Sequence, residues 1–188
     1  MFKKLFLPLV FLFSASVSFA GTFDVGLNDS SVQLRTGIVL TEDDYGKTLF
    51  DARVLHNDHE ETTLGSAGVD FAGEPGNVPG LLMGLGVKGY YGEADQDRKF
   101  SALGIGGLLN YYPPALGGFG LSGRLVYAPE ISTAEDADRL FESSVALSYA
   151  LTAKIRLTCE YQVVRVDWEK GSHWTVDEGF RLGFQAKF

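Results

Sequence analysis

The sequence predicts an all-β protein, an antiparallel up-and-down transmembrane β-barrel of about ten strands. The first observation behind this prediction is the composition, because 45% of the residues are hydrophobic, 13% are aromatic and 23 are glycine. The second is that, after residue 20, no apolar run approaches the roughly twenty residues that a membrane-spanning helix needs. The third is a period-two alternation of apolar and polar residues, which recurs along the chain and continues to the final Phe188.

The first twenty residues have the order of a secretory signal peptide. Lys3 and Lys4 precede an apolar run of about nine residues, and small residues close the segment at Ala20. This run is about half the length of a spanning helix, and Pro8 interrupts it. We therefore expect residues 1–20 to be a signal peptide that is removed after Ala20, and residues 21–188 to form the exported barrel.

The charge balance of the chain argues against a nucleic-acid partner. The formal net charge is −8, and it becomes −10 when Lys3 and Lys4 leave with the signal peptide. Binding to phosphate backbones requires a basic surface, so no nucleic-acid partner is expected. Cys159 is the only cysteine, which excludes an internal disulfide framework. No cofactor is expected.

Ten segments carry the pattern of a strand. We expect strands near 22–28, 31–40, 47–56, 63–72, 80–91, 100–112, 117–128, 139–151, 154–168 and 175–188. The alternation changes phase across "NDSS", so we place a tight turn there, although a bulge within one long strand would also shift the phase. Eight strands are the alternative, and either even number returns both ends to one side of the barrel.

The strands from residue 80 onward are the most regular. In "LLMGLGVKGYYG" the odd-numbered residues of 81–87 form an apolar face, while glycines and Lys88 form the other. The segments "SALGIGGLLNYY", "GFGLSGRLVYAPE", "RLFESSVALSYAL" and "AKIRLTCEYQV" repeat this division. Tyr91, Tyr127 and Tyr149 fall near strand ends, where an interfacial aromatic girdle would place them. Each strand therefore has one face suited to lipid and one suited to a narrow interior.

The connections alternate between long or acidic segments and short or Pro/Gly-rich ones. The first kind comprises "HNDHEETT", "YGEADQDRK", "APEISTAEDADR" and "EKGSHWTVDE", and the second comprises "GEPGNVPG", "PPALGG" and "LTA". Outer-membrane barrels have long external loops and short periplasmic turns. We therefore expect the acidic connections to lie outside the cell and the last strand to run down to the periplasmic side.

The polar face of the strands supplies the candidate lumen residues. A narrow lumen needs small side chains and charges of both signs that can pair, whereas a soluble barrel of the lipocalin kind has an oily interior and a polar exterior. A soluble exterior has no reason to be so rich in glycine, which favours the membrane barrel. The charged residues expected to face the lumen are Arg35, Asp51, Arg53, Lys88, Arg124, Glu142, Arg156, Glu160 and Arg181.

Three segments, "GLGVKGYYGEAD", "GGLLNYYPPALGGFG" and "YAPEISTAEDADR", resemble the YfaZ family of bacterial proteins, which are predicted to reside in the outer membrane. The resemblance covers nearly all of the mature chain and is most specific at "NYYPP" and "YAPE". It implies a signal peptide and a small outer-membrane barrel. The family brings no established activity and no catalytic residues that can be transferred to this sequence.

The last eight residues, "RLGFQAKF", resemble the C-terminal signal of outer-membrane barrels. That signal places a polar residue, a glycine, a hydrophobic residue and a terminal aromatic at fixed spacing, and Arg181, Gly183, Ala186 and Phe188 occupy those positions. Ala186 is smaller than the usual hydrophobic residue. The resemblance implies that the barrel-assembly machinery is a transient partner. We also expect the last strand to close the barrel against the first.

Two motifs permit other functions. Residues 84–89 match G-x-G-x-x-G, but the alternation continues through the glycines and no helix begins there, so small lumen-facing residues are the better interpretation. His56 and His59, with Asp58 and Glu60, could hold a metal that His173 could approach in space, but a solvated loop is the simpler interpretation of this cluster. A loop pair such as His173 with Asp177 could activate water in an outer-membrane enzyme, but no nucleophile motif supports it.

Three functions remain open from the sequence. The first is a structural or surface-interacting barrel, whose acidic loops meet outer-membrane lipids, lipopolysaccharide or another surface partner. The second is a narrow channel for small solutes or ions, since about 8–10 strands leave a lumen that side chains mostly fill. The third is an outer-membrane enzyme, for which the sequence identifies no catalytic residue, so we expect no enzymatic activity.

Overall fold

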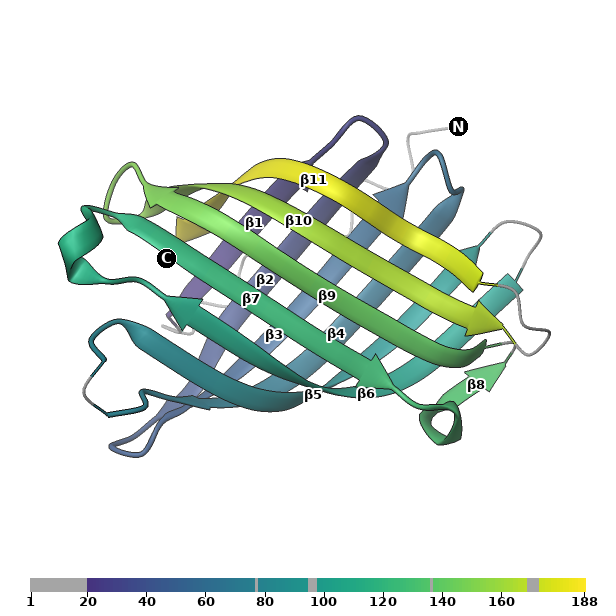
Figure 1. Ribbon diagram of the computed structural model, residues 1–188, viewed down its shortest axis with the longest axis horizontal. Helices are drawn as coiled ribbons and strands as arrows, with labels where there is room; N and C mark the ends of the chain where they lie inside the picture. The colour runs from purple at the N-terminus through teal and green to yellow at the C-terminus, as the bar shows by residue number, and fades with distance from the viewer. Residues whose placement is uncertain (1–19, 77, 95–97, 136, 169–172) are drawn as a thin grey trace.

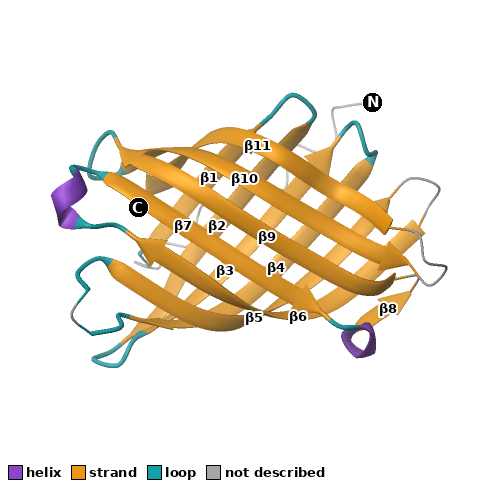
Figure 2. Cartoon of the chain, in the orientation of Figure 1, coloured by secondary structure: helices purple, strands orange, loops and turns teal. Residues whose placement is uncertain are grey.

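A computed structural model describes residues 20–188 apart from 77, 95–97, 136 and 169–172, so the predicted signal peptide lies outside it up to residue 19. The described residues form a closed antiparallel β-barrel (Figure 1), and Figure 2 shows that almost the whole fold is strand. The wall strands are β1 (Gly21–Leu27), β2 (Ser31–Glu42), β3 (Lys47–Asn57), β4 (Thr62–Gly73), β5 (Leu81–Ala94), β6 (Arg98–Tyr111), β7 (Phe119–Ala128), β9 (Ala137–Ala150), β10 (Ile155–Trp168) and β11 (His173–Lys187). The predicted fold class is confirmed, with ten wall strands rather than eight.

Pairing between the first and last strands closes the barrel. β1 pairs with β11 from Thr22 opposite Lys187 to Leu27 opposite Leu182, as the sequence predicts. The remaining wall strands pair with their neighbours along the chain, including β5 with β6 and β7 with β9. A closed ring pairs the backbone of every strand on both sides, which satisfies the N–H and C=O groups without water. Within the described residues no helix is long and apolar enough to cross a membrane.

The tight turn expected in "NDSS" is present between β1 and β2. The side-chain Oδ1 of Asn28 accepts hydrogen bonds from the backbone N–H groups of Ser30 and Ser31. An Asn side chain that bonds the backbone two residues further on stabilises a turn. The phase change in the sequence therefore reflects a turn between two strands and not a bulge within one strand.

The two ends of the barrel differ less in loop length than the sequence predicts. We call the end with Gly21 and Phe188 the terminal end and the opposite one the loop end (Figure 1). At the loop end β5 runs to Ala94 and β6 begins at Arg98, so most of "YGEADQDRK" is strand. At the terminal end the connection 74–80 between β4 and β5 is longer. Near the end of this ladder Glu93 is opposite Lys99, and such opposite charges on paired strands favour pairing.

The connection "APEISTAEDADR" is also largely structured. After Ala128 the chain leaves the wall in a 3-10 turn, η4 (Glu130–Ser132), and returns as the short strand β8 (Thr133–Glu135), which pairs with the start of β6. Pro129 has no N–H to donate, so it cannot continue the ladder of β7. Ile131 projects from this turn and is 95% exposed.

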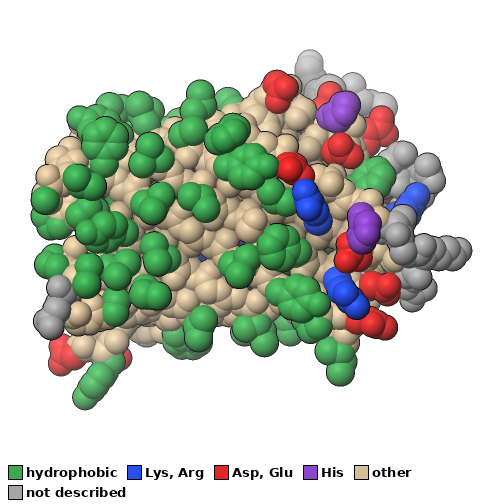
Figure 3. Space-filling view, in the orientation of Figure 1, with side chains coloured by type: hydrophobic (Ala, Val, Ile, Leu, Met, Phe, Trp, Pro, Cys, Tyr) green, Lys and Arg blue, Asp and Glu red, His purple; other side chains and the backbone are tan. Residues whose placement is uncertain are grey.

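The outer wall is apolar around the whole ring. Every wall strand presents at least one large hydrophobic side chain that is more than a third exposed, and Leu85, Ile105 and Phe180 reach 71%, 69% and 70%. Figure 3 shows these side chains spread over most of the visible face. This distribution is the reverse of a soluble lipocalin-like barrel, whose exterior is polar.

Candidate functional site

Charged side chains gather in the lumen. Six of the nine residues predicted to face it are at most 8% exposed, namely Asp51, Arg53, Lys88, Glu142, Glu160 and Arg181. The side chains of Arg35 and Arg124 are 26% and 19% exposed. Arg156 is half-buried near the terminal end, beside the connection between β6 and β7. These positions follow from strand alternation, which sends every second side chain of a strand inward.

The centre of the lumen is a buried ion pair between opposite walls. Arg53 on β3 donates to Glu142 on β9 through two hydrogen bonds, from Nη1 to Oε1 at 2.9 Å and from Nη2 to Oε2 at 2.8 Å. The Lys88 Nζ lies 3.9 Å from Glu142 Oε1. Two parallel charge-assisted bonds fix the orientation of both groups. This pair therefore joins two strands that face each other across the barrel.

A second set of ion pairs joins β3, β4, β5 and β7. The Asp51 Oδ2 lies 3.0 Å from the Lys88 Nζ, and its Oδ1 lies 3.5 Å from the Arg124 Nη1. Arg124 Nη2 also donates to Asp70 Oδ2 at 2.8 Å. Asp70 is absent from the predicted set, although its place in the alternation of β4 marks it as inward. Arg124 lies between the carboxylates of Asp51 and Asp70, so each of them is close to a positive charge.

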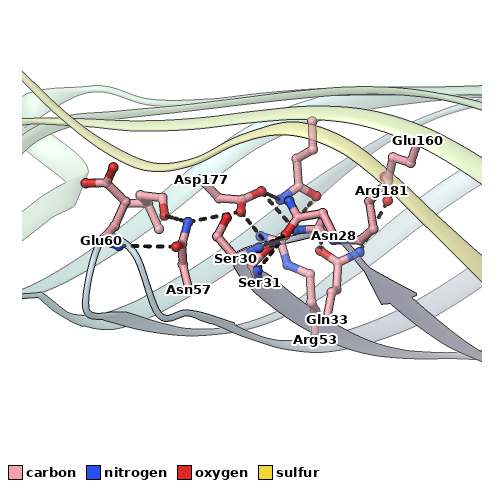
Figure 4. Close-up of polar contacts among 12 residues, drawn as sticks. Asn28, Ser30, Ser31, Gln33, Arg53, Asn57, Glu60, Glu160, Asp177 and Arg181 are labelled. Atoms are coloured by element: carbon pink, nitrogen blue, oxygen red, sulfur yellow. Dashed lines mark hydrogen bonds and ion pairs between the residues drawn. The ribbon is translucent and has the colours of Figure 1, made fainter.

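A third group surrounds Arg181 on β11 (Figure 4). Its Nη2 donates to Asp177 Oδ2 at 2.9 Å and to Ser31 Oγ at 2.7 Å. Gln162 connects this group to the central pair, since its Nε2 donates to Asp177 and its Oε1 accepts from Arg53. The polar part of the lumen is thus one continuous network.

Asp177 lies inside the barrel, which overturns the loop pair suggested for it with His173. Asp177 continues the inward alternation of Arg181, and a β-bulge in β11 skips Val176 in the ladder with β10 and turns that side chain inward as well. His173 lies at the start of β11 and its Nδ1 is 2.7 Å from Asp167 Oδ1, where both side chains are exposed. The extra residue of a bulge redirects the side chains beside it. Nothing in the sequence locates that extra residue.

The other histidines are separate from each other and from the lumen network. His56 belongs to strand β3, and its Nδ1 lies 2.9 Å from Thr63 Oγ1, so placing His56 and His173 in loops was wrong. His59 lies in the turn before β4, where its backbone N–H donates to Asn57 Oδ1. Among the described residues no three His, Cys, Asp or Glu side chains gather as a metal site.

Toward the loop end the contents of the lumen change from polar to apolar. Buried hydrophobic side chains from eight wall strands pack together there, and we call them the lumen cap: Leu55, Leu64, Tyr90, Phe100, Ala102, Val126, Ala128, Ala137, Leu140, Val164, Val166, Trp168 and Val176. The rings of Phe100 and Trp168 meet edge to face with centroids 6.0 Å apart. The sequence analysis missed this cap. Its signal is that both faces turn apolar near the strand ends, as in the neighbours Val163 and Val164.

At the level of the lumen cap the outer surface of the barrel changes from apolar to charged. Beside the cap strands, Arg165 on β10 and Glu178 on β11 form an exposed ion pair at 2.8 Å, and Lys99 on β6 is exposed. Figure 3 shows charged and histidine side chains gathered at this end of the visible face, with hydrophobic ones over the remainder. The loop end is therefore apolar inside and polar outside, whereas the rest of the barrel is polar inside and apolar outside.

At the terminal end the lumen opens into a cavity of about 580 Å³, which we call the vestibule. Its rim includes Gly21, Lys187 and Phe188, and its wall reaches inward to the ion pairs of Arg124 and Glu160. Hydroxyl and amide side chains make up much of the remaining lining: Thr22, Gln33, Asn110, Ser122, Ser144, Ser148, Thr158 and Gln185. The vestibule is therefore a recess at one end of the barrel with charged, hydroxyl and amide groups among its lining.

Comparison with known proteins adds no assignment. No family model and no curated protein matches the chain, so the resemblance to the YfaZ family stays a prediction. Similar solved structures include the KdgM porin, 13% identical, with 90% of this chain and 99% of the porin covered and a TM-score of 0.43. The KdgM porin in complex with disordered oligogalacturonate has the same identity and coverage and a TM-score of 0.44. At these values the likeness carries no argument about function.

Proposed function

We propose that the protein is a β-barrel of the outer membrane, closed to solutes at its loop end, with a structural or surface-interacting role. The observation that carries this proposal is the inversion of polarity along the barrel axis. Exposed hydrophobic side chains on every wall strand form an apolar surface much larger than soluble monomers leave in water. The polar rim at the loop end, with Arg165 and Glu178, marks where that surface ends.

Cell fractionation tests the membrane location. The full chain is expected in the outer-membrane fraction, and the folded protein is expected to migrate faster on a gel when unheated than when boiled. A soluble periplasmic protein with one mobility would contradict the assignment.

The proposal includes export and assembly. Residues 1–20 would direct export, and the C-terminal pattern of Arg181, Gly183, Ala186 and Phe188 would engage the assembly machinery. Two features support the pattern: a side chain at Gly183 would overlap the Val25 carbonyl oxygen, and Phe188 is 62% exposed. Lipopolysaccharide remains the proposed partner of the charged loop end.

The lumen cap supports a closed barrel rather than an open pore. Leu55, Leu64, Phe100 and Leu140 are 0% exposed and come from four different strands, so packed hydrocarbon occupies much of the lumen there. Beside it the polar side chains Ser31, Asn57 and Asp177 are buried and hydrogen-bonded to one another, which leaves little room for a hydrated ion.

Planar-bilayer recording tests this closure. The wild-type protein is expected to show no resolved conductance steps, whereas the double variant Phe100→Ala/Leu140→Ala is expected to conduct because it empties the middle of the cap. The control Leu85→Ala/Leu103→Ala removes side chains from the outer face, where they are 71% and 53% exposed, and is expected to stay closed.

A narrow channel for small solutes or ions is the second candidate. The vestibule favours it, because this cavity of about 580 Å³ already offers charged, hydroxyl and amide groups to a solute. Transport would require the lumen cap to move aside. Regular conductance steps from the wild-type protein at low voltage would support the channel and contradict the closed barrel.

A further inference from the structure

We propose that the mouth of the vestibule binds a small anion, a carboxylate- or phosphate-bearing molecule, between Lys187, which lines it, and Arg156, which lies against the lining residues Tyr112 and Ser148. This proposal requires the barrel fold and an open terminal end. It does not depend on whether the loop end is closed, so the two proposals can be tested separately. It begins with the charges in and around the vestibule that have no opposite partner.

Most cations of the vestibule are already paired. Arg35 lies 3.3 Å from Glu160, Arg124 lies 2.8 Å from Asp70, and Arg181 lies 2.9 Å from Asp177. These pairs leave little positive charge for a ligand. Arg156 and Lys187 differ, because no described carboxylate forms an ion pair with either of them within 4.0 Å.

The guanidinium of Arg156 is held in place by neutral groups, and no described carboxylate forms an ion pair with it. It lies over the Tyr112 ring, 4.4 Å from the ring centroid, and its Nη1 makes only long contacts of 3.5 Å to the Gly118 carbonyl and 3.4 Å to Ser148 Oγ. Tyr112 is itself positioned by its hydroxyl, 3.0 Å from Ser122 Oγ. A guanidinium packed on an aromatic face keeps its edge donors free for a planar or tetrahedral anion.

Lys187 adds a second positive charge at the same place. It is the last residue of β11 and lines the vestibule at its rim. Gln185, two residues before Lys187 and on the same face of β11, is opposite Arg156 in the ladder with β10. The positive charges of Lys187 and Arg156 are therefore close enough to repel each other. Two cations held together without an anion form an unfavourable arrangement that a bound anion would relieve.

Asp24 is the acidic side chain closest to these cations in the ladder, since it stands opposite Gln185. Its carboxylate accepts a hydrogen bond from the Gln185 Nε2 at 2.9 Å. On its other side Asp24 stands opposite Arg35, whose positive charge interacts with it. Asp24 is therefore engaged away from Arg156 and does not neutralise the pair.

The cavity fits a small ligand with one or two anionic groups. Its volume of about 580 Å³ is within the usual range for small-molecule sites. The hydroxyl and amide groups along the wall would bind the remainder of a polar molecule. Inorganic phosphate and succinate represent the two chemistries and are the probes for the test.

The test is titration calorimetry on the full chain folded in detergent, at low ionic strength, with phosphate and succinate in separate experiments. Wild-type protein is expected to bind at least one probe, and Arg156→Gln and Lys187→Gln are each expected to weaken binding about tenfold or more. Lys47→Gln is the matched control, because Lys47 is a lysine at the same end whose Nζ is already paired with Glu42 Oε1 at 2.8 Å.

Two results would overturn the proposal. One is the absence of millimolar binding of both probes by folded wild-type protein. The other is equal weakening by all three substitutions, which indicates attraction to the net charge of this end and not a site. Which probe binds more tightly distinguishes a carboxylate from a phosphate ligand.

A melting experiment separates binding from structural support. Without an anion, Lys187→Gln is expected to melt at the wild-type temperature or above, because the substitution removes a repulsion. Phosphate or succinate, whichever binds, is expected to raise the melting temperature of wild-type protein and not of the variant. A Lys187→Gln protein that melts lower and still gains stability from the anion contradicts the proposal.

Discussion

Both halves of the lumen are filled by side chains, but by different chemistry. The lumen cap consists of hydrocarbon, whose contacts have no direction and need no particular partner. The polar half consists of charges that bridge opposite walls, and each depends on one or two others, as Arg53 depends on Glu142. A buried charge that loses its partner keeps its full desolvation cost, whereas hydrocarbon that loses a neighbour loses only that contact. The polar half should therefore be the less tolerant of single substitutions.

The largest effect is expected from breaking the central pair on one side only. Arg53→Met leaves Glu142, 0% exposed, without its bidentate partner and with Lys88 at 3.9 Å as the remaining ion-pair partner, and should cost about 3–5 kcal/mol of unfolding free energy. Arg53→Met/Glu142→Leu replaces both charges with hydrocarbon and should cost much less. Urea unfolding in lipid vesicles measures both variants. Equal losses in the single and the double variant would show that the pairing itself is not what matters.

An intermediate effect is expected from overpacking the lumen cap. A Cβ at Gly92 would overlap the ring of Phe100, which is 0% exposed and enclosed, so Gly92→Ala should cost about 1–3 kcal/mol. Gly65→Ala is the control, since the nearest atom to its added Cβ is the Tyr91 carbonyl oxygen at 3.8 Å. The same unfolding measurement applies. If Gly92→Ala is as harmless as Gly65→Ala, the cap is looser than its burial indicates.

The smallest effect is expected on the outer rim. Glu178→Gln breaks the ion pair with Arg165, but these side chains are 37% and 51% exposed, so the loss should be below about 1 kcal/mol. Arg165–Glu178 and Arg53–Glu142 are both Arg–Glu ion pairs, so comparing Glu178→Gln with Arg53→Met compares the stability loss outside and inside the barrel. A rim loss as large as the lumen loss would mean that burial does not set the difference between the two sites.

Local alternation was sufficient for the fold, but not for the complete site. The strands in the later half of the chain could be predicted, because alternation depends only on neighbouring residues. The pairing of the first and last strands could be predicted as well, because an even number of strands allows antiparallel closure. Asp70 was missed although its alternation is regular, since a single acid in "GVDFAG" looks unremarkable beside richer segments. Asp177 was also missed although it continues the inward alternation of Arg181, since it was expected in a loop; only the bulge that turns Val176 inward leaves no mark in the sequence.

The alternation along the chain was enough to predict an antiparallel barrel of about ten strands with an apolar exterior, while the count of ten rather than eight came from the strand pairing. Successive side chains of a strand point to opposite faces, so the order of polar and apolar residues shows which side chains face outward. The hydrophobic cluster near the loop end, and the lack of a carboxylate paired with Arg156 or Lys187 at the other end among the described residues, are visible only in the folded barrel. Those features arise where walls meet, as between Arg53 and Glu142, 89 residues apart, and no local pattern records such distances.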